Sequence, residues 1–289
     1  MGQANMLTEM RLGDFLEHFT VRIVAHPASG EWESSGTGFY FNFGAEGGLT
    51  RPAIITNRHV VEGAAELSFR FNLHPDDAAN REGFLIRVTD PWATILPHPD
   101  PDVDLVVIMV GPLFAAMKDK FGVMPSAAFA NASHIPDEAQ LASFDAVQEV
   151  VMVGYPLGLY DPVNNAAIVR KGVTASPLRN RYYGRDEFLV DLPVFEGSSG
   201  SPILVVNEGT YFDAGRVVLN GRRVYILGVL FAGYETTKEG DIVARPAPTS
   251  RQQVNMKFGV NLGLCLRSSR ISEMRTVIAA WAEELGRRD

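Results

Sequence analysis

Two adjacent serines stand between glycines in residues 195–205, which read FEGSSGSPILV. A serine hydroxyl becomes a nucleophile near neutral pH when a neighbouring base, usually histidine, takes its proton and a carboxylate orients that base. Gly197 and Gly200 leave the backbone around Ser198 and Ser199 unobstructed, so amide groups can converge on one point, as an oxyanion hole requires. With Ser199 as the nucleophile, its own N–H group and that of Gly197 would be the donors. A Gly/Ser-rich turn without chemistry is the alternative for this segment taken alone.

Among the six histidines of the chain, His59 has the context that best suits a catalytic base. It lies in AIITNRHVVEG, where the chain leaves a strand-like run and begins a short helical turn. A side chain at the end of a rigid strand is held firmly, although a strand-end histidine with a satisfied hydrogen bond would look the same. His98 in LPHPDP is a competing candidate, but its flanking prolines and its closeness to Asp104 indicate a loop residue.

The carboxylate of such a site is sought at the start of a strand, and HPDPDVDLVVIMV offers three aspartates. Asp104 opens the apolar run 105–110, whereas Asp100 and Asp102 are typical of solvated turns. A strand-start aspartate that only shapes a turn is the alternative. The order His, Asp, Ser, with separations of 45 and 95 residues, matches one of the convergent triads and excludes the orders of α/β-hydrolases and subtilisins.

Strand-like runs must position these residues, and they recur along the chain between turn-forming residues. The first half contains them at 20–25, 36–43, 53–57, 66–71, 83–88 and 104–110, and the second half at 149–155, 167–176, 187–194, 202–206, 223–233 and 257–266. Because no helical crossover between them is long enough for parallel pairing, they predict an all-β protein of two antiparallel barrels or sandwiches.

Helical patterns occupy the remaining segments. Residues 112–120 predict a short helix, and 267–287 predict a longer one that Ser268 or Ser269 would cap. The apolar face of the longer helix would consist of Ile271, Met274, Val277, Ile278, Trp281 and Leu285. The expected divisions are an N-terminal helical extension (1–19), a first barrel (20–115), a connection (116–146), a second barrel (147–266) and the C-terminal helix (267–289).

Composition narrows the class of protein. The chain has 289 residues, 46% of them hydrophobic, and a net charge of −8, which disfavours binding to nucleic acid or to an anionic membrane. A single cysteine, Cys265, excludes an intramolecular disulfide and favours a reducing compartment, with the thiol in the core. No secretory signal or membrane-spanning run is present in this sequence, and no cluster has metal-ligand spacing. We therefore expect a cytoplasmic protein without metal or cofactor.

The chain resembles the chymotrypsin-like (trypsin-fold) serine peptidases, most closely their bacterial, disulfide-free HtrA/Deg-like branch. The blocks that carry the resemblance are SGTGFYF, TNRHVVEG, DVDLVVI, GYPLG, GSSGSP and ILGVLFAG, in that order between residues 20 and 270. The resemblance implies two six-stranded antiparallel β-barrels with the active site between them and a C-terminal helix. It also implies a serine endopeptidase that works through an acyl-enzyme, with His59 as general base, Asp104 as its orienting carboxylate and Ser199 as nucleophile.

The resemblance further implies how a substrate is bound. Phe231, Ala232 and Gly233 would form an edge strand that pairs with an extended peptide. Pro193 would lie at the base of the specificity pocket, and Gly233 and Gly259 would leave the pocket walls open. Because no acid stands at the pocket base, we expect an apolar residue before the scissile bond rather than Arg or Lys.

Several features modify that expectation. Asp191 and Glu196 lie close enough to the pocket to alter its preference. Secreted members of the family carry an aspartate where this chain has Ser198, and that aspartate pairs with a newly cut N-terminus, so activation by N-terminal insertion is not expected here. The loops 157–167 and 178–187 flank the site and are candidates for control by ordering. One helix follows the second barrel in this sequence, so regulation by a PDZ domain, common in HtrA proteins, is not assumed.

Two other functions stay open at this point. A trypsin fold can serve as a catalytically idle binding or scaffolding module, although such proteins usually lose a triad residue, and this chain retains all three. An esterase-like hydrolase of small acyl substrates is the third reading, against which the long substrate edge argues. The expected partners are a protein or peptide substrate and, as a further candidate, a regulatory protein.

Overall fold

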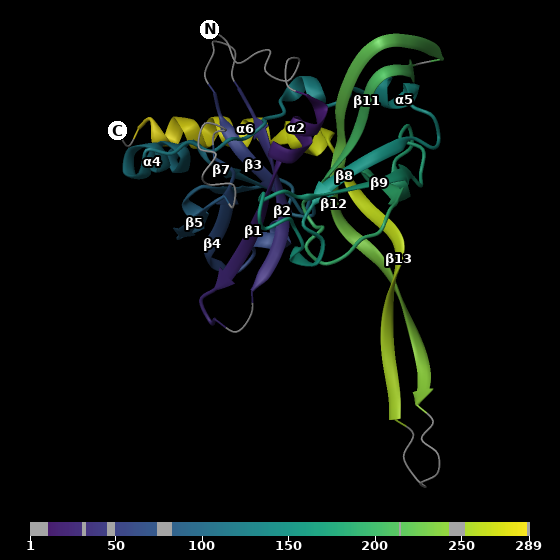
Figure 1. Ribbon diagram of the computed structural model, residues 1–289, viewed down its shortest axis with the longest axis horizontal. Coiled ribbons are helices and arrows are strands. Elements are labelled where there is room, and N and C mark those ends of the chain that lie inside the picture. Colours follow the sequence, from purple (N-terminus) through teal and green to yellow (C-terminus); the bar gives the residue numbers. More distant parts are fainter. Residues whose placement is uncertain are drawn as a thin grey trace.

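The structure is a computed structural model that describes residues 11–30, 33–44, 50–73, 83–213, 215–242 and 252–287. Its strands form two antiparallel sheets that lie side by side, and a helix follows near the C-terminus (Figure 1). The predicted all-β class with a C-terminal helix is therefore confirmed. No helix in those ranges is long and apolar enough to cross a membrane.

The first sheet has seven strands in the order β5-β4-β1-β2-β3-β7-β6 and is not closed into a barrel by the described residues. They are β1 (Thr20–Pro27), β2 (Ser34–Asn42), β3 (Pro52–Thr56), β4 (Ala64–Phe71), β5 (Phe84–Thr89), β6 (Ile95–Pro97) and β7 (Val106–Met109). The sequence predicts six strands here. The additional strand, β6, has only three residues, too few to show an alternating pattern, and it pairs with β7.

The second sheet closes into a six-stranded barrel in the order β10-β13-β12-β11-β8-β9. Its strands are β8 (Glu149–Gly154), β9 (Ile168–Thr174), β10 (Glu187–Asp191), β11 (Pro202–Asp213), β12 (Arg216–Ile242) and β13 (Gln252–Arg267). The last three are longer than predicted, and β12 and β13 continue beyond the barrel as a two-stranded ribbon that ends at the pair Ile242–Gln252 (Figure 1). Polar residues dominate 234–242, so the apolar pattern stops before the strand does.

One apolar cluster spans both sheets. Phe39 and Ile55 of the first sheet belong to the same buried cluster as Leu204 and Ile226 of the second. Because burial of apolar surface is the main force that holds packed elements together, this shared cluster favours one arrangement of the two sheets. The seam between them is where residues from both halves can meet.

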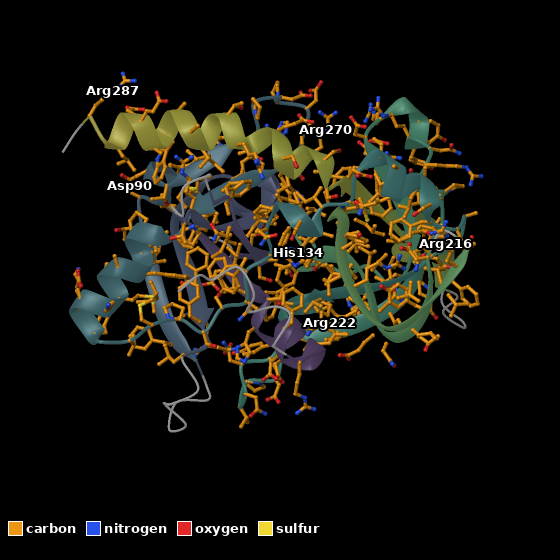
Figure 2. The ribbon with its side chains drawn as sticks, turned by 90° about the horizontal axis from the view of Figure 1, so that it is seen from above. Asp90, His134, Arg216, Arg222, Arg270 and Arg287 are labelled. Carbon is orange, nitrogen blue, oxygen red and sulfur yellow. The ribbon has the colours of Figure 1, made fainter. Side chains whose placement is uncertain are left out.

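The C-terminal helix α6 (Ser269–Leu285) covers this cluster (Figure 2). Of its predicted apolar face, Ile271, Met274 and Ile278 are buried, Val277 and Trp281 are partly buried, and Leu285 is exposed. Ser268 stands at the N-cap position, but its side chain makes no capping hydrogen bond. The predicted side-chain cap is therefore wrong. Cys265 is fully buried, as expected.

Shorter helices complete the fold. The predicted helix near 112–120 is α4 (Gly111–Phe121), while α2 (Leu12–His18) leads into β1 and α5 (Glu138–Ser143) precedes β8. Asp137 and Gln140 form a capping box at the start of α5. Single 3-10 turns lie at Pro91–Ala93, Ala132–His134, Pro156–Gly158 and Tyr182–Gly184.

Candidate active site

His59 lies where β3 ends and the short helix α3 (Arg58–Val61) begins. The buried side chains of Val60 and Val61 anchor this turn in the core of the first sheet. The imidazole itself is 44% exposed. The histidine is therefore rigidly attached at its backbone, and its side chain is accessible from solvent.

Asp104 meets His59 directly. Its carboxylate Oδ2 lies 2.5 Å from His59 Nδ1, and its Oδ1 accepts the His59 backbone N–H at 3.0 Å. The Asn57 side chain donates to the Asp104 carbonyl at 2.8 Å. A carboxylate on Nδ1 orients the ring and leaves Nε2 free to take a proton.

The electrostatics of Asp104 suit this role. Burial works to raise the pKa of the Asp104 carboxyl, but the hydrogen bonds and charge of His59, together with the charge of Arg58, outweigh it and hold the pKa below its ordinary value. Asp104 is therefore ionised at neutral pH. Asp100 and Asp102 shape the preceding turn instead, since the Asp102 N–H donates to the Asp100 side chain at 3.0 Å.

The loop of residues 197–201 leaves two amide groups unused. The N–H groups of Ser198, Gly200 and Ser201 donate to the carbonyls of Phe195 (3.0 Å), Leu230 (2.9 Å) and Ser198 (3.0 Å), respectively. The N–H groups of Gly197 and Ser199 have no acceptor in the described part of the chain. A loop that pairs its other amides and spares these two has the donors that an oxyanion hole needs.

Glycine is required at both ends of this turn. Gly197 and Gly200 have φ of +80° and +84°, a region that side-chain-bearing residues rarely adopt. A Cβ atom at Gly197 would lie 2.4 Å from the Tyr155 carbonyl oxygen, and one at Gly200 would lie 2.0 Å from the Thr37 carbonyl oxygen. The turn is therefore pressed against neighbours from both sheets, which explains why its glycines flank the serine pair.

Thr37 of β2 joins this loop to the first sheet. Its backbone N–H donates to the Ser199 carbonyl at 2.9 Å, and its hydroxyl donates to the Gly197 carbonyl at 2.9 Å while accepting from the Tyr155 N–H at 3.1 Å. The Thr56 hydroxyl in turn donates to the Thr37 carbonyl at 2.7 Å, three residues before His59. Sequence reasoning missed Thr37, although it stands in the SGTGFYF block.

Replacing Thr37 with the isosteric valine tests this link. Thr37→Val leaves the buried Gly197 carbonyl and Tyr155 N–H without a partner, so we expect the free energy of unfolding to fall by about 1–3 kcal/mol for each group. Urea unfolding measures the loss. Thr210→Val, at an exposed position of β11, is the control, and a loss below about 0.5 kcal/mol for Thr37→Val would show that the hydroxyl does not join the halves.

Ser199 carries no hydrogen bond to His59 among the described residues. The two residues are linked through Thr37 and Thr56, but no hydrogen bond joins them directly. Such contacts are often looser in the absence of substrate. The structure therefore contains the His59–Asp104 pair and the spared amides, with the serine hydroxyl unpaired.

A second serine–histidine–carboxylate arrangement lies on the first sheet. His26 Nε2 is 2.7 Å from Ser68 Oγ, and His26 Nδ1 is 3.1 Å from Glu33 Oε1. Ser68 stands inside β4, paired with β1 on one side and β5 on the other. The backbone N–H groups of a strand with a neighbour on each side are used in the hydrogen bonds of the sheet. This arrangement therefore lacks the unpaired amide donors found in the Ser199 loop.

The predicted substrate edge is open. The pairing of β11 with β12 ends at Val229, and Leu230 still bonds to Gly200 and Ser201. Beyond Leu230, β12 pairs only with β13 among the described residues. Phe231, Ala232 and Gly233 therefore present one unpaired edge next to the nucleophile loop. An extended peptide can add to such an edge through main-chain hydrogen bonds.

The two glycines expected at the pocket walls, Gly233 and Gly259, do not pair with each other. Gly233 pairs with Gly263, whereas Gly259 pairs with Glu235 on the ribbon. A Cβ atom at either Gly233 or Gly263 would come within 3.0 Å of the Val194 side chain, so Val194 lies between these two glycines. Gly233 and Gly263 therefore both adjoin Val194, whereas Gly259 lies on the ribbon.

Pro193, expected at the pocket base, and Glu196, expected close to the pocket, are at the surface. Pro193 is exposed, and its carbonyl accepts a hydrogen bond from Arg170. Glu196 is also exposed, and its carbonyl accepts the Leu157 N–H at 2.5 Å. The side chain next to Gly233 is thus that of Val194, and those next to Gly263 are Leu230, Val190 and Val194.

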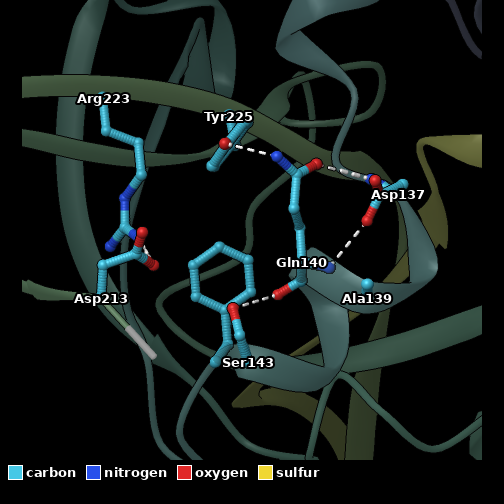
Figure 3. A pocket seen from close by; sticks show the side chains of 8 residues that line it. Asp137, Ala139, Gln140, Ser143, Asp213, Arg223 and Tyr225 are labelled. Atoms are coloured by element: carbon cyan, nitrogen blue, oxygen red, sulfur yellow. Dashed lines mark hydrogen bonds and ion pairs between the residues drawn. The ribbon is translucent and has the colours of Figure 1, made fainter. Parts of the chain in front are cut away.

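A separate hollow of about 280 Å³ lies between α5 and the β11–β12 hairpin (Figure 3). Gln140 Nε2 donates to the Tyr225 hydroxyl at 2.7 Å, and Arg223 pairs with Asp213 at 2.7 Å. Because these polar groups already bond to one another, they offer no unpaired group to a ligand. Within the described ranges, no group of three or more His, Cys, Asp or Glu could hold a metal ion.

Comparison with known proteins finds one matching family and solved structures that are similar to this chain. Residues 36–212, more than half of the chain, match the trypsin-like peptidase domain. The active form of the Rv3671c protease from M. tuberculosis is 16% identical, with a TM-score of 0.46 over 94% of this chain and 86% of that one. The serine endoprotease from Yersinia pestis is 12% identical, with a TM-score of 0.47 over 92% of this chain and 65% of that one. No curated protein matches the chain.

Proposed function

Because the chain belongs to the trypsin-like peptidase domain family, we propose that it is a serine endopeptidase whose catalytic triad consists of His59, Asp104 and Ser199. One observation carries the proposal. The loop around Ser199 spares the N–H groups of Gly197 and Ser199, on the same seam at which His59 is bonded to an ionised Asp104.

The reaction follows from these positions. Ser199 Oγ attacks the carbonyl carbon of the scissile bond while His59 Nε2 takes its proton, and the oxyanion is bound by the N–H groups of Gly197 and Ser199. The C–N bond then breaks, and the leaving amine takes the proton from His59. Water, deprotonated by His59, attacks the acyl ester, and the proton returns to Ser199 Oγ as the carboxylic acid leaves. Asp104 stabilises the imidazolium formed in both steps.

Covalent labelling tests this assignment. A fluorophosphonate probe reacts with an activated serine and becomes attached to its oxygen. Peptide mapping of the labelled protein by mass spectrometry should find the probe on Ser199. Absence of labelling in the folded protein would count against the triad.

We also propose that the pocket prefers an apolar residue of medium size before the scissile bond. The side chains nearest to a Cβ atom at Gly233 or Gly263 are the apolar ones of Val194, Leu230 and Val190. A cationic side chain buried against them would have no partner, which is costly. Val194 occupies space between the two glycine walls, which favours medium over large side chains.

Removing the Val194 side chain tests that preference. Val194→Gly should raise kcat/KM for peptides with a large aromatic residue before the scissile bond, relative to those with valine, by about tenfold. Cleavage of a proteome-derived peptide library, read by mass spectrometry, measures the change. Val147→Gly, at an exposed position, is the control, and an unchanged profile in Val194→Gly would exclude Val194 from the pocket.

A catalytically idle binding module is the second candidate, and one observation favours it. Ser199 has no hydrogen bond to His59 among the described residues, so the nucleophile is not visibly activated. The same labelling experiment separates the two functions, because an idle module does not react with the probe. The single cysteine and the acidic composition support a cytoplasmic location for either one.

A further inference from the structure

Arg170 of β9 reaches the loop that carries the nucleophile. Its Nη1 donates to the Pro193 carbonyl at 2.7 Å, and its Nη2 donates to the Ser198 hydroxyl at 3.0 Å. These two acceptors stand at opposite ends of residues 193–198, the segment that leads into Ser199. We propose that Arg170 is a positioning residue that holds this segment in the shape in which the Gly197 and Ser199 amides face the reacting carbonyl. The inference rests on the proposed triad and goes beyond it.

The environment of Arg170 supports a role in geometry. No carboxylate forms an ion pair with it within the described ranges, and its Nε is buried without a partner. Burial lowers its pKa to about 10, so the guanidinium is still charged at neutral pH. A half-buried cation without a counter-ion is costly, and its two charged hydrogen bonds to the loop offset that cost. Displacement of the loop would therefore be opposed by the guanidinium.

The loop is held from a second side as well. The Leu157 N–H donates to the Glu196 carbonyl, and in a trans peptide the N–H of the next residue points away from that carbonyl. The Gly197 N–H is thus directed away from Leu157. Ser198, which is fully buried, also accepts the Phe195 N–H through its hydroxyl at 3.4 Å. Leu157 thus fixes the carbonyl of the peptide that supplies the first oxyanion donor, and Arg170 holds residues on both sides of that peptide.

Arg170 also accounts for the serine that precedes the nucleophile. The resemblance implies that secreted relatives have an aspartate at this position, paired with an ammonium group created by cleavage. In this chain the residue at that position is neutral, and a guanidinium of the chain itself bonds to it. The Arg170 guanidinium therefore takes the place of the ammonium group, and the loop can be ordered without a newly cut N-terminus.

Kinetics of three variants test the proposal. Arg170→Met should lower kcat for a peptide substrate by at least about tenfold with KM changed less than about twofold, because oxyanion donors act in the transition state. The affinity of a peptide boronate, which forms a tetrahedral adduct with the serine, should fall in parallel. Arg170→Lys should restore part of the loss, since one amine cannot reach both acceptors. Lys171→Met, whose parent side chain pairs with Glu149 at the surface, should behave as the wild type.

The results of these measurements distinguish a failure of the Arg170 proposal from a failure of the proposed triad. Arg170→Met with unchanged kcat, or with lowered kcat and unchanged boronate affinity, overturns it, provided that both are measured well below the melting temperature. If the wild type does not react with the fluorophosphonate probe, the proposed triad is wrong. Hydrogen exchange of the loop amides then tests whether Arg170 holds the loop. Faster exchange of the Ser198, Gly200 and Ser201 amides in Arg170→Met than in Lys171→Met supports the bracing role, and equal exchange overturns it.

Discussion

Ser199→Ala is expected to abolish fluorophosphonate labelling and to lower kcat for peptide cleavage by a factor on the order of 10⁵ or more. The reason is that Ser199 alone combines a hydroxyl with the two spared amides of its loop. Ser198→Ala should still be labelled, although more slowly, because its hydroxyl is buried beneath the loop and bonded to Arg170. Labelling with a fluorescent probe and initial rates on a peptide library substrate measure both effects.

Ser68→Ala is the matched control for this experiment. Ser68 also touches a histidine that touches a carboxylate, so it tests whether a triad-like contact is enough for reactivity. We expect Ser68→Ala to label and cleave as the wild type does. If the probe is found on Ser68 rather than on Ser199, the hydrogen bond between a serine and a histidine determines the reactive serine, and the unpaired backbone amides do not.

Asp104→Asn should lower kcat by a factor on the order of 10⁴ while the protein stays folded. An amide cannot balance the imidazolium that forms when His59 takes a proton, and its N–H₂ group favours the wrong tautomer of the ring. Asp102→Asn removes a neighbouring aspartate that does not touch His59 and is the control. A loss below about tenfold would show that His59 is oriented by something other than Asp104.

The same pair of proteins should differ in stability with pH. The pKa of Asp104 lies below its ordinary value of 3.8, so the wild-type carboxylate stabilises the fold above about pH 4, and this contribution is lost as the pH falls through the lowered pKa. Asparagine does not titrate. Urea unfolding should therefore show the wild type's advantage over Asp104→Asn narrowing as the pH falls below about 4, and an advantage that is constant with pH would contradict the pairing.

Local pattern was enough to predict the strands, the C-terminal helix and the candidates for base and carboxylate. The apolar runs at 53–57 and 149–155 have the composition of buried strands, and the runs in the structure differ from them by a residue or two. His59 and Asp104 stand next to such runs, where the chain's path is easily inferred. The contact between them still had to come from the fold, since 45 residues separate them.

The register of β12 and β13 could not be predicted. A bulge lies between the pairs Gly233–Gly263 and Glu235–Gly259, and the alternating pattern of a strand does not reveal such an irregularity. The choice between Gly259 and Gly263 as a pocket wall therefore depends on the fold. Thr37 and Arg170 were missed for a related reason, because their partners lie on strands or loops that are distant in sequence. A threonine or an arginine within a strand carries no local signal of what it will touch.

The bonds of Thr37 have a consequence for how the enzyme's two halves depend on each other. His59, the proposed general base, follows a strand of the first sheet, and Ser199, the proposed nucleophile, precedes a strand of the second. The hydroxyl and amide of Thr37 cross the seam between them. The proposed triad is therefore complete only when the two sheets are packed together. A ligand that contacts both His59 and the Ser199 loop can bind only when the two sheets are packed together. By mass action, such a ligand stabilises the packing of the two sheets reversibly, as a ligand at a subunit interface stabilises a dimer.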